Sequence, residues 1–487
     1  LVEDAGRVSA SLGEFLDLLP RKIEEKLKKK NRFVWIKRKI SWEEKEHIQS
    51  LGLKGVGILR EKKRFYPEKD LALSLLGIVD IDNRGLEGIE LFYNDYLSGK
   101  QGWARILQDS ASRRVLVSSE VINPQKGADI TLTVDAQIQY WAKNYLQEAV
   151  DKFDALKGGA VVMDAATGKI LALANCLNSE IKEKQNIGRY FKNGAVCDMF
   201  EPGSVFKVVT LIASLDLNLF SSNDHIFCEK GAMKIPGTVL NDWKPYGDLK
   251  FNEVFMKSSN IGVAKIAFRL SPSVLNRYIR KLGFGERSGI DFPGETPGSL
   301  KKLSNWSKTS GYIIPIGQEI GVNLIQLVRA FAVVANGGYL VKPHLADEVC
   351  SWGFCRASPS EKKQVISSDV ARRAKDILVS VVEEGTGRLA KVEGLTIGGK
   401  TGTAQKYDPD IGRYSASKYR ATFIGFIADT EPPVVIGVSI DEPGKSHFGG
   451  VVAAPVVREI ARKIAPYLNY REIRVSGAES RKSSGTN

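Results

Sequence analysis

A serine followed three positions later by a lysine is the pattern in this sequence with the clearest chemical use. Residues three apart share one face of a helix, where a lysine amine can take the proton of a serine hydroxyl and make it a nucleophile. The string is common, and the sequence contains five copies: Ser179/Lys182, Ser204/Lys207, Ser299/Lys302, Ser360/Lys363 and Ser415/Lys418. The pattern alone therefore does not identify a catalytic serine.

The Ser204 copy differs from the other four in its surroundings. It follows Glu-Pro-Gly, and residues 205–215 are mostly apolar with Lys207 as their only cation, which predicts a buried helix. Burial disfavours a charged amine, so Lys207 can act as a base near neutral pH, while the helix N-terminus favours negative charge on Ser204. A lysine that extends from the helix end into solvent is the structural alternative. The other four copies lie in polar, loop-like sequence, where exposed side chains are expected.

A nucleophilic serine also needs a proton path to the leaving group and a group that holds the substrate. The tripeptide Ser-Ser-Asn can supply both, and it occurs at residues 221–223 and 258–260. The first copy lies in a polar turn. The second opens the apolar segment 261–268, so Ser258 and Asn260 are expected to project from a packed element, and we favour this copy.

The run Lys400-Thr401-Gly402-Thr403 occurs once, just before a predicted strand, and is therefore expected along a sheet edge. Lys400 can attract a substrate carboxylate and Thr401 can donate a hydrogen bond to it. Gly402 would let a substrate backbone approach the strand.

Residues 394–401 also match the P-loop pattern G-x-x-x-x-G-K-[ST]. A P-loop requires a helix that starts at its Lys-Thr, so that the helix N-terminus meets the phosphates. Residues 402–410 contain Gly, Asp and Pro and do not predict a helix. We therefore reject a nucleotide-binding interpretation.

Composition narrows the class of protein. A chain of 487 residues predicts two or three domains, and its formal charge of +14 favours an anionic partner. The densest basic stretch, residues 22–39, alternates with acidic and apolar residues like a solvated helix face, and no nucleic-acid motif accompanies it. The most apolar long stretch, residues 324–335, is too short to span a membrane. We expect neither nucleic-acid binding nor a membrane span within this sequence.

The five cysteines and four histidines do not predict a metal site. No C-x-x-C or H-x-x-x-H pair occurs, so structural zinc and a histidine-based metal centre are not expected. Cys350 and Cys355 are near enough to form a disulfide across a turn, and two free thiols are the alternative. The sequence lacks an initial Met and a signal-peptide pattern, from which we expect that a longer natural chain precedes it.

The elements that must position these residues fall into three parts. Residues 1–125, which include a helical pattern at 12–27, predict a non-catalytic α+β module. Residues 126–470 predict the catalytic domain, and the polar, Ser-rich residues 471–487 predict a disordered tail.

Within the catalytic part, strand-forming sequence lies at both ends and a largely helical segment lies between. Asp135 is a candidate N-cap for a helix through residue 153, and a hairpin is expected at 159–174. A second hairpin is expected at 421–440, followed by a helix at 451–468. The pattern indicates one antiparallel sheet flanked by helices and assembled from both ends.

Together, the three motifs in this order resemble the class B penicillin-binding proteins. The similar blocks, which include these motifs, lie at residues 65–67, 85–90, 200–207, 257–262, 316–318, 335–338 with 343–344, 400–405 and 441–443. The resemblance implies an α+β N-terminal module, of the pedestal or dimerisation type, followed by an α/β penicillin-binding transpeptidase domain with a mostly helical subdomain. Ser-Ser-Asn is similar to the division-type, septal branch. Val205 departs from the threonine common in the family, and the usual N-terminal membrane anchor is absent from this sequence.

The resemblance implies D,D-transpeptidation of peptidoglycan stem peptides and acylation by β-lactams, with no metal or organic cofactor. The implied catalytic residues are Ser204 as nucleophile, Lys207 as base and Ser258 as proton relay. The implied substrate-binding residues are Asn260, Lys400, Thr401, Gly402 and Thr403, with the backbone N–H groups of Ser204 and Thr403 as oxyanion hole.

It also implies an anchored protein on the extracytoplasmic face of the bacterial cytoplasmic membrane, with a glycosyltransferase and division proteins as partners. A D,D-carboxypeptidase or β-lactamase-like hydrolase and a penicillin-sensing receptor are the alternatives.

Overall fold

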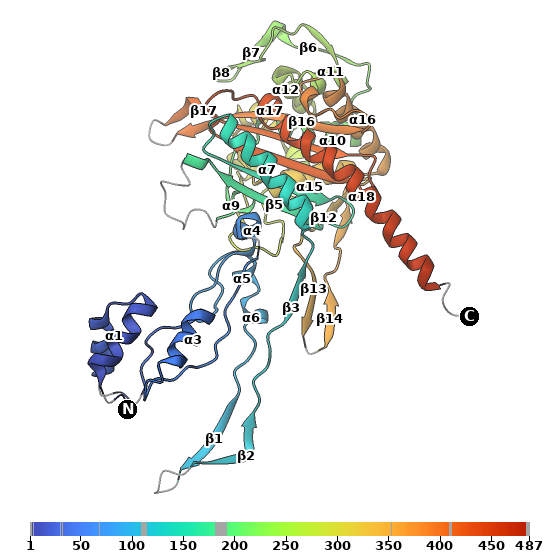
Figure 1. Ribbon diagram of the computed structural model, residues 1–487. Helices are drawn as coiled ribbons and strands as arrows, with labels where there is room; N and C mark the ends of the chain where they lie inside the picture. The colour runs from blue at the N-terminus through green and yellow to red at the C-terminus, as the bar shows by residue number, and fades with distance from the viewer. Residues whose placement is uncertain are drawn as a thin grey trace.

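The computed structural model describes most of the chain, in an elongated N-terminal module and a larger body built around one sheet (Figure 1). The described residues are 2, 4–29, 31, 33–67, 69–108, 114–180, 192–351, 353–408 and 412–483.

The N-terminal module contains short helices and one long strand pair. Its elements are α1 (Ala5–Leu16), α2 (Pro20–Leu27), α3 (Trp42–Ser50), α4 (Lys69–Leu76), α5 (Gly88–Phe92), α6 (Asn94–Leu97), β1 (Trp103–Gln108) and β2 (Arg114–Ile122). The helical pattern expected at 12–27 forms two helices instead of one. Asp17 adopts the left-handed conformation with φ 52° at the end of α1, and Pro20 starts α2, because proline is tolerated in the first turn of a helix but not inside it.

The body holds the remaining elements. Its sheet strands are β4 (Lys157–Asp164), β5 (Ile170–Leu177), β16 (Ile397–Asp408), β17 (Arg413–Ile427) and β18 (Val434–Asp441). Its helices are α7 (Ala136–Lys152), α9 (Gly194–Cys197), η2 (Gly203–Phe206), α10 (Lys207–Asp216), η3 (Glu229–Gly231), α11 (Phe251–Met256), α12 (Asn260–Leu270), α13 (Pro272–Lys281), η4 (Leu303–Asn305), α14 (Ser310–Ile313), η5 (Ile314–Ile316), α15 (Leu324–Ala335), α16 (Ser368–Glu383), η6 (Arg388–Ala390), α17 (Gly449–Val452) and α18 (Ala454–Ser483).

The body also contains several small sheets of two or three strands. They are formed by β3 (Asp129–Leu132), β6 (His225–Phe227), β7 (Ala232–Ile235), β8 (Thr238–Asn241), β9 (Asp248–Lys250), β10 (Ser299–Leu300), β11 (Ile320–Gly321), β12 (Tyr339–Val341), β13 (Ala346–Ser351), β14 (Phe354–Ala357) and β15 (Lys362–Gln364). The pairs β6/β9 and β7/β8 were not predicted from the sequence, and they interrupt the expected helical middle.

The main sheet is antiparallel, with strand order β16-β17-β18-β4-β5, so the two predicted hairpins meet side by side. Successive side chains of a strand point to opposite faces. Accordingly Val161 and Met163 of β4 pack in one core with α10 and α15, whereas Ala160 and Val162 pack in a second core with α7 and α18. The helices cover both faces of the sheet (Figure 1). The expected fold class is confirmed.

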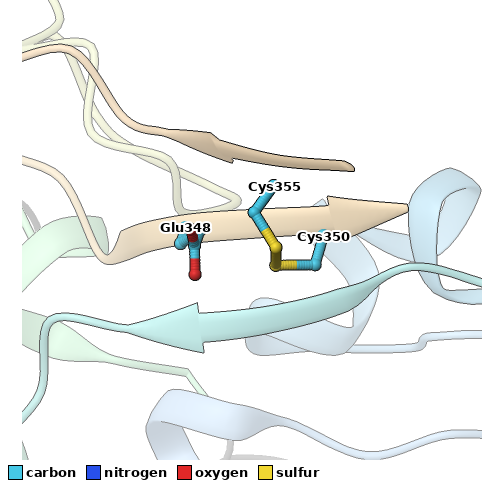
Figure 2. Close-up of side chains that lie close together, drawn as sticks. All are labelled: Glu348, Cys350 and Cys355. Atoms are coloured by element: carbon cyan, nitrogen blue, oxygen red, sulfur yellow. A yellow bond between two sulfur atoms is a disulfide. The ribbon is translucent and has the colours of Figure 1, made fainter. Parts of the chain in front are cut away.

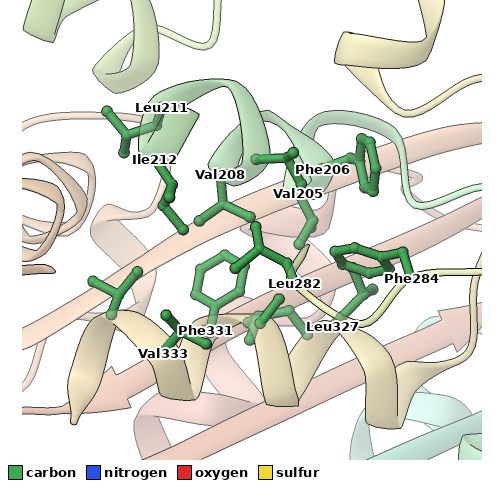
Figure 3. Packing of buried hydrophobic residues seen from close by; sticks show 14 of the residues in the cluster. Val205, Phe206, Val208, Leu211, Ile212, Leu282, Phe284, Leu327, Phe331 and Val333 are labelled. Carbon is green, nitrogen blue, oxygen red and sulfur yellow. The ribbon is translucent and has the colours of Figure 1, made fainter. Parts of the chain in front are cut away.

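Helix α10 is the buried helix predicted after Ser204. Its side chains Val208 and Ile212 face Phe331 and Val333 of α15 in the core (Figure 3). Burial on nearly every side fixes the start of α10, and therefore Lys207, against the rest of the body.

The start of α7 and the end of α18 bear on two predictions from the sequence. Asp135 caps α7, since its side chain accepts hydrogen bonds from the N–H groups of Gln137 and Ile138. Residues 471–483 continue α18, residues 484–487 lie outside the described residues, and the disordered tail expected at 471–487 stays a prediction. Glu, Arg, Ala and Lys in this segment are good helix formers, so a helix that is nucleated by the packed residues before it can propagate.

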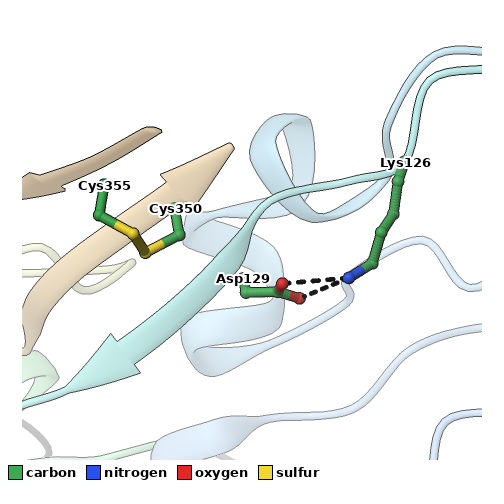
Figure 4. The surroundings of a disulfide bond; sticks show 4 residues. All are labelled: Lys126, Asp129, Cys350 and Cys355. Atoms are coloured by element: carbon green, nitrogen blue, oxygen red, sulfur yellow. Dashed lines mark hydrogen bonds and ion pairs between the residues drawn. A yellow bond between two sulfur atoms is a disulfide. The ribbon is translucent and has the colours of Figure 1, made fainter. Parts of the chain in front are cut away.

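The sequence leaves open whether Cys350 and Cys355 are free thiols or a disulfide. In the structure the two form a disulfide. They lie directly opposite each other on β13 and β14, with Cα atoms 4.0 Å apart. On its other side β13 pairs with β3, whose Asp129 lies opposite Cys350 and forms a 3.0 Å ion pair with Lys126 (Figure 4). The disulfide therefore closes the end of a three-stranded ribbon.

None of the helices in the described ranges combines the length and the apolar character required to cross a bilayer.

Candidate active site

Ser204 lies in the 3-10 turn η2, immediately before α10. Gly203 adopts φ 55°, and its N–H donates a 3.0 Å hydrogen bond to the carbonyl of Gly317. Gly317 has φ 84°, and a Cβ atom there would lie 2.1 Å from the carbonyl oxygen of Gly203. Glycine at position 317 thus allows a neighbouring segment to pack directly against the turn that presents Ser204.

Lys207 is fully buried, and its side chain points to the second predicted motif. Its Nζ donates hydrogen bonds to the Ser258 carbonyl (2.7 Å), to Ser258 Oγ (3.2 Å) and to Asn260 Oδ1 (2.8 Å). Within the described residues the Ser204 hydroxyl has no hydrogen-bond partner, and this residue is partly exposed. The hydroxyl is therefore open to a substrate beside a buried polar network.

Lys400 reaches the same network from the sheet. It is 1% exposed, and its Nζ donates a 2.8 Å hydrogen bond to Ser258 Oγ. Both lysines thus donate to one hydroxyl, whose own proton stays available for a third group. This bridge brings together the three motifs that the sequence analysis selected.

The two amines have depressed pKa values. Burial lowers the pKa of Lys207 to about 7, and the negative charge of Asp242 partly opposes this shift. Burial and the neighbouring charge of Lys207 lower the pKa of Lys400 well below its usual range. A neutral amine at Lys207 is a base that can accept a proton near neutral pH.

Asp242 belongs to this network but was not predicted from the sequence. Its carboxylate accepts hydrogen bonds from the Ser259 hydroxyl (2.6 Å), from the Asn260 N–H (2.5 Å) and from the Ile261 N–H (3.1 Å). These contacts hold the turn in which Ser258 adopts the left-handed conformation with φ 57°, which is uncommon for a residue with a side chain. No sequence signal identifies Asp242, because it is a single acidic residue after a short strand.

The threonines of β16 are held by residues from elsewhere in the chain. Thr401 Oγ1 forms a 2.9 Å hydrogen bond with Thr386 Oγ1, and Thr403 Oγ1 accepts one of 3.0 Å from the Gly449 N–H. Thr386 was not predicted from the sequence. Strand β16 is at the edge of the main sheet, as predicted for this motif.

Gly402 has a packing role that was not predicted from the sequence. A Cβ atom at this position would lie 2.7 Å from Val205 Cγ2 and 2.8 Å from the Pro202 carbonyl. The space that glycine leaves is therefore filled by the turn that carries Ser204, and it allows β16 to pack against η2. A direct role of Gly402 in substrate binding stays a prediction.

The rejected copies of the motifs lie outside this network. Ser221 donates to Asp224 in an exposed turn, Ser360 donates to the Thr167 carbonyl, and Ser415 Oγ accepts a hydrogen bond from the Lys418 N–H. Lys182 lies outside the described residues. The P-loop match also fails, since residues 397–408 are a strand.

One cluster of side chains in the described part of the chain has the composition of a metal site: Glu348, Cys350 and Cys355 (Figure 2). Both cysteine sulfurs are in the disulfide, whereas a metal would require free thiolates. These residues therefore do not form a metal site in the oxidised protein.

Comparison with known proteins gives two family matches. The model described as penicillin binding protein transpeptidase domain matches residues 158–462, and that described as penicillin-binding protein dimerisation domain matches residues 2–132.

Individual relatives cover nearly the whole chain. Stage V sporulation protein D of Bacillus subtilis (strain 168) is 35% identical over 96% of this chain and 74% of its own length. The probable peptidoglycan D,D-transpeptidase PenA of Neisseria gonorrhoeae is 34% identical over 93% of this chain and 76% of its own. Among solved structures, penicillin binding protein 3 from Mycobacterium tuberculosis in complex with aztreonam has a TM-score of 0.74 and 31% identity, covering 84% of this chain and 90% of that one.

Proposed function

Because the chain belongs to the class B penicillin-binding proteins, we propose that it cross-links peptidoglycan stem peptides with Ser204 as nucleophile. The reaction is D,D-transpeptidation. The serine displaces the terminal D-Ala of a donor stem to form an acyl-enzyme, and an amine of a neighbouring stem then displaces the serine.

In the first step Lys207 takes the proton of Ser204 while its oxygen attacks the carbonyl carbon between the two D-Ala residues. The backbone N–H groups of Ser204 and Thr403 stabilise the negative charge that develops on the carbonyl oxygen. In the structure Lys207 Nζ forms no hydrogen bond with Ser204 Oγ. Catalytic hydrogen bonds commonly form only when substrate is bound.

The proton must then reach the nitrogen of the departing D-Ala. Ser258 accepts hydrogen bonds from both buried lysines, so its own proton can pass to the leaving amine while Lys207 replaces it. Asn260 holds the donor peptide, and Lys400 with Thr401 binds the terminal carboxylate. The same relay, run in reverse, removes a proton from the acceptor amine in the second step.

The observation that carries this proposal is the buried Lys207–Ser258–Lys400 bridge beside the open hydroxyl of Ser204. Its test is covalent labelling by a β-lactam, followed by intact-mass analysis and peptide mapping. Label is expected on Ser204 and absent from Ser204→Ala, while Ser360→Ala, a matched change in another Ser-x-x-Lys pair, should label normally. Label on Ser299 or Ser415 would contradict the proposal.

A second assay distinguishes transpeptidation from hydrolysis. With lipid-linked precursor polymerised by a glycosyltransferase, the wild-type protein should produce cross-linked stem dimers. Release of D-Ala with only shortened, unlinked stems would indicate a carboxypeptidase, and acylation without any turnover of stems would indicate a sensor.

We place this activity in septal wall synthesis on the extracytoplasmic face of the cytoplasmic membrane, together with a membrane-bound glycosyltransferase and division proteins. The Cys350–Cys355 disulfide supports this location, because disulfides persist in oxidising compartments. The charge of +14 suits a carboxylate-rich polymer.

A further inference from the structure

Three side chains that could bind a metal ion lie together on the ribbon formed by β3, β13 and β14, and the proposed mechanism uses none of them. They are Glu348, Cys350 and Cys355, whose carboxylate and sulfur atoms all lie within 4.8 Å of one another. In the oxidised protein both sulfurs are in the disulfide. Reduction of that bond would convert them into two thiols, which bind metal ions as thiolates.

The backbone pairing places all three side chains on one face of the ribbon. Glu348 and Cys350 are two residues apart on β13, so their side chains point to the same face. Cys355 lies opposite Cys350 on β14 and shares that face. Figure 2 shows the carboxylate of Glu348 on the side of the ribbon that carries the disulfide. Asp347 points to the other face, where it pairs with Lys169 at 2.7 Å.

The Glu348 carboxylate is available as a ligand. Within the part of the chain that the structure describes, no hydrogen bond or ion pair engages this side chain, although it is only partly exposed. Its partner across β3 is Thr131, which carries no charge. The acidic residue of β3, Asp129, already forms an ion pair with Lys126 (Figure 4). A cation held between Glu348 and the two sulfurs would give this carboxylate the partner that it lacks.

The disulfide is open to reduction, because Cys355 is exposed. The thiolate of a dithiol reductant can attack the Cys355 sulfur, and the second thiol of the reductant then resolves the mixed disulfide. The reductant leaves as a disulfide, and each cysteine gains one electron and one proton.

Loss of the cross-link should not separate the two thiols. The bond joins residues only five positions apart, and a short loop restrains the unfolded chain little, so the bond contributes little stability. Strand β13 is also paired with β14 on one side and with β3 on the other. We expect this pairing to persist and to keep Cys350 and Cys355 side by side.

The set of donor atoms identifies the class of ion. Two thiolates and one carboxylate suit zinc, whereas magnesium and calcium prefer oxygen ligands alone. Donor atoms around a tetrahedral zinc ion are about 3.6 Å apart, given bonds of about 2.0 to 2.3 Å. Because the three groups already lie within 4.8 Å of one another, side-chain rotation is sufficient to bring them to one ion. Three protein ligands leave a fourth position that water can occupy.

We propose that reduction of the Cys350–Cys355 disulfide creates a zinc site, with Cys350, Cys355 and Glu348 as its protein ligands and a water molecule in the fourth position. Binding of the ion displaces the two thiol protons. The ion then joins β13 to β14 in place of the covalent bond. Only the reduced, metal-free chain lacks a cross-link at this end of the ribbon.

Cobalt(II) is the probe for this site, because it can replace zinc and its bonds to thiolates absorb light. The full chain is reduced with dithiothreitol, freed of the reductant under nitrogen and titrated with cobalt chloride. The reduced wild type should bind one equivalent, with a thiolate-to-cobalt absorption that excess zinc removes. The oxidised chain should show no such absorption. A reduced wild type without this absorption would overturn the proposal.

Cys355→Ser separates this site from the other cysteines of the chain. The variant should lose the absorption, although it keeps the free cysteines Cys176, Cys197 and Cys228. Absorption retained in Cys355→Ser would assign the metal to those cysteines and overturn the proposal.

Glu348→Gln tests the carboxylate ligand. It should lower the affinity for cobalt by at least about tenfold, the scale of losing a group that supports a metal site. Glu361→Gln makes the same charge change at an exposed ion pair with Lys342 and should keep the wild-type affinity. Equal affinities in the two variants would contradict a role for Glu348 as a ligand.

Thermal unfolding is a second measurement of the same site. Zinc should raise the unfolding temperature of the reduced wild type, because it binds the folded chain, and should leave that of the oxidised chain unchanged. An equal shift in both chains would show that zinc binds elsewhere. β-lactam labelling of Ser204 is measured separately, so failure of the zinc site would leave the proposed function intact.

Discussion

At the scale of single residues, the proposed chemistry depends on two buried lysines that share the hydroxyl of Ser258. Two positive charges at this separation repel each other in a site with little water. The two amines therefore favour states in which at most one is charged. A bound substrate carboxylate would favour the positive charge on Lys400, which would leave Lys207 as the neutral amine when Ser204 reacts.

The first prediction is the pH dependence of acylation. With a pKa of about 7, the neutral fraction of Lys207 increases as pH rises and decreases as pH falls. The acylation rate should therefore rise through pH 7 and level off above about pH 8. The rate constant for labelling by a fluorescent penicillin, measured from pH 5.5 to 9, checks this.

Lys207→Arg is the matched variant for this prediction. A guanidinium keeps the positive charge but is not deprotonated in proteins, so acylation should fall by at least about a hundredfold. A variant that kept most of the rate would show that Lys207 acts as a fixed charge and that another group is the base.

A second prediction concerns Asp242, which is a positioning residue. In Asp242→Asn the amide oxygen can still accept hydrogen bonds from the Asn260 and Ile261 N–H groups, but the charge that raises the pKa of Lys207 is gone. The acidic limb of the pH–rate profile should shift to lower pH. Asp242→Ala, which also loses the hydrogen bonds, should reduce the plateau rate by about tenfold or more.

A role in folding alone would lower the amount of active protein without moving the pH profile. An unchanged profile in Asp242→Asn would therefore contradict the electrostatic part of this prediction.

These residues also show what sequence can and cannot reveal about the site. Ser204, Lys207, Ser258 and Lys400 were predictable because each lies in a short motif with a recognisable local context. Asp242 was not predictable, because its role arises from contacts between a short hairpin and a turn that come together only in the folded chain. The same is true of Thr386.

At the scale of elements, the position of Ser204 depends on how closely the segment at Gly317 approaches η2. The third prediction compares Gly317→Ala with Gly337→Ala. Both glycines have similar backbone conformations, with φ 84° and 82°, so the cost of a left-handed alanine, about 1 kcal/mol, is common to both.

Only the change at Gly317 adds a collision, since its Cβ would lie 2.1 Å from the Gly203 carbonyl, whereas nothing lies within 4 Å of the Cβ at Gly337. Gly317→Ala should therefore slow acylation by at least about tenfold more than Gly337→Ala, because the collision displaces the nucleophile. Penicillin labelling and thermal unfolding of both variants check this. Equal effects would show that the turn can move without loss of reactivity.

Element prediction from sequence succeeded where local signals were strong and failed where they were weak. The sheet and its flanking helices were predicted correctly from the cap at Asp135 and the two hairpins. The short pairs β6/β9 and β7/β8 contain three or four residues per strand, and such short segments have no periodicity that distinguishes them from loops.

At the scale of the whole molecule, the two family modules share part of one core. Leu75 and Ile89 of the N-terminal module belong to the same buried cluster as α10 and α15 of the catalytic body. The Gln139 side chain donates a 3.2 Å hydrogen bond to the Leu71 carbonyl across the same junction. The boundary expected at residue 125 falls between β2 and β3 and stays a prediction.

The fourth prediction concerns the polar contact at this junction. The Tyr93 hydroxyl donates a 2.6 Å hydrogen bond to Asp291 Oδ2, and the same carboxylate accepts from the N–H groups of Leu345 and Ala346. Burial and the Asp291 charge raise the pKa of Tyr93, so its hydroxyl remains a donor at all physiological pH values. Tyr93→Phe removes this donor and leaves the ring, which should weaken the junction by about 1–3 kcal/mol.

Because the contact is far along the chain from the Ser204 motifs, the consequence should be separable from catalysis. Limited proteolysis should cut Tyr93→Phe between the N-terminal module and the body several times faster than the wild type, while penicillin labelling of Ser204 keeps its rate. Tyr96→Phe, which removes a hydroxyl from a side chain that is 58% exposed, is the matched control and should be cut at the wild-type rate. If Tyr93→Phe and Tyr96→Phe were cut equally, the apolar contacts of Leu75 and Ile89 would be sufficient to hold the two modules together.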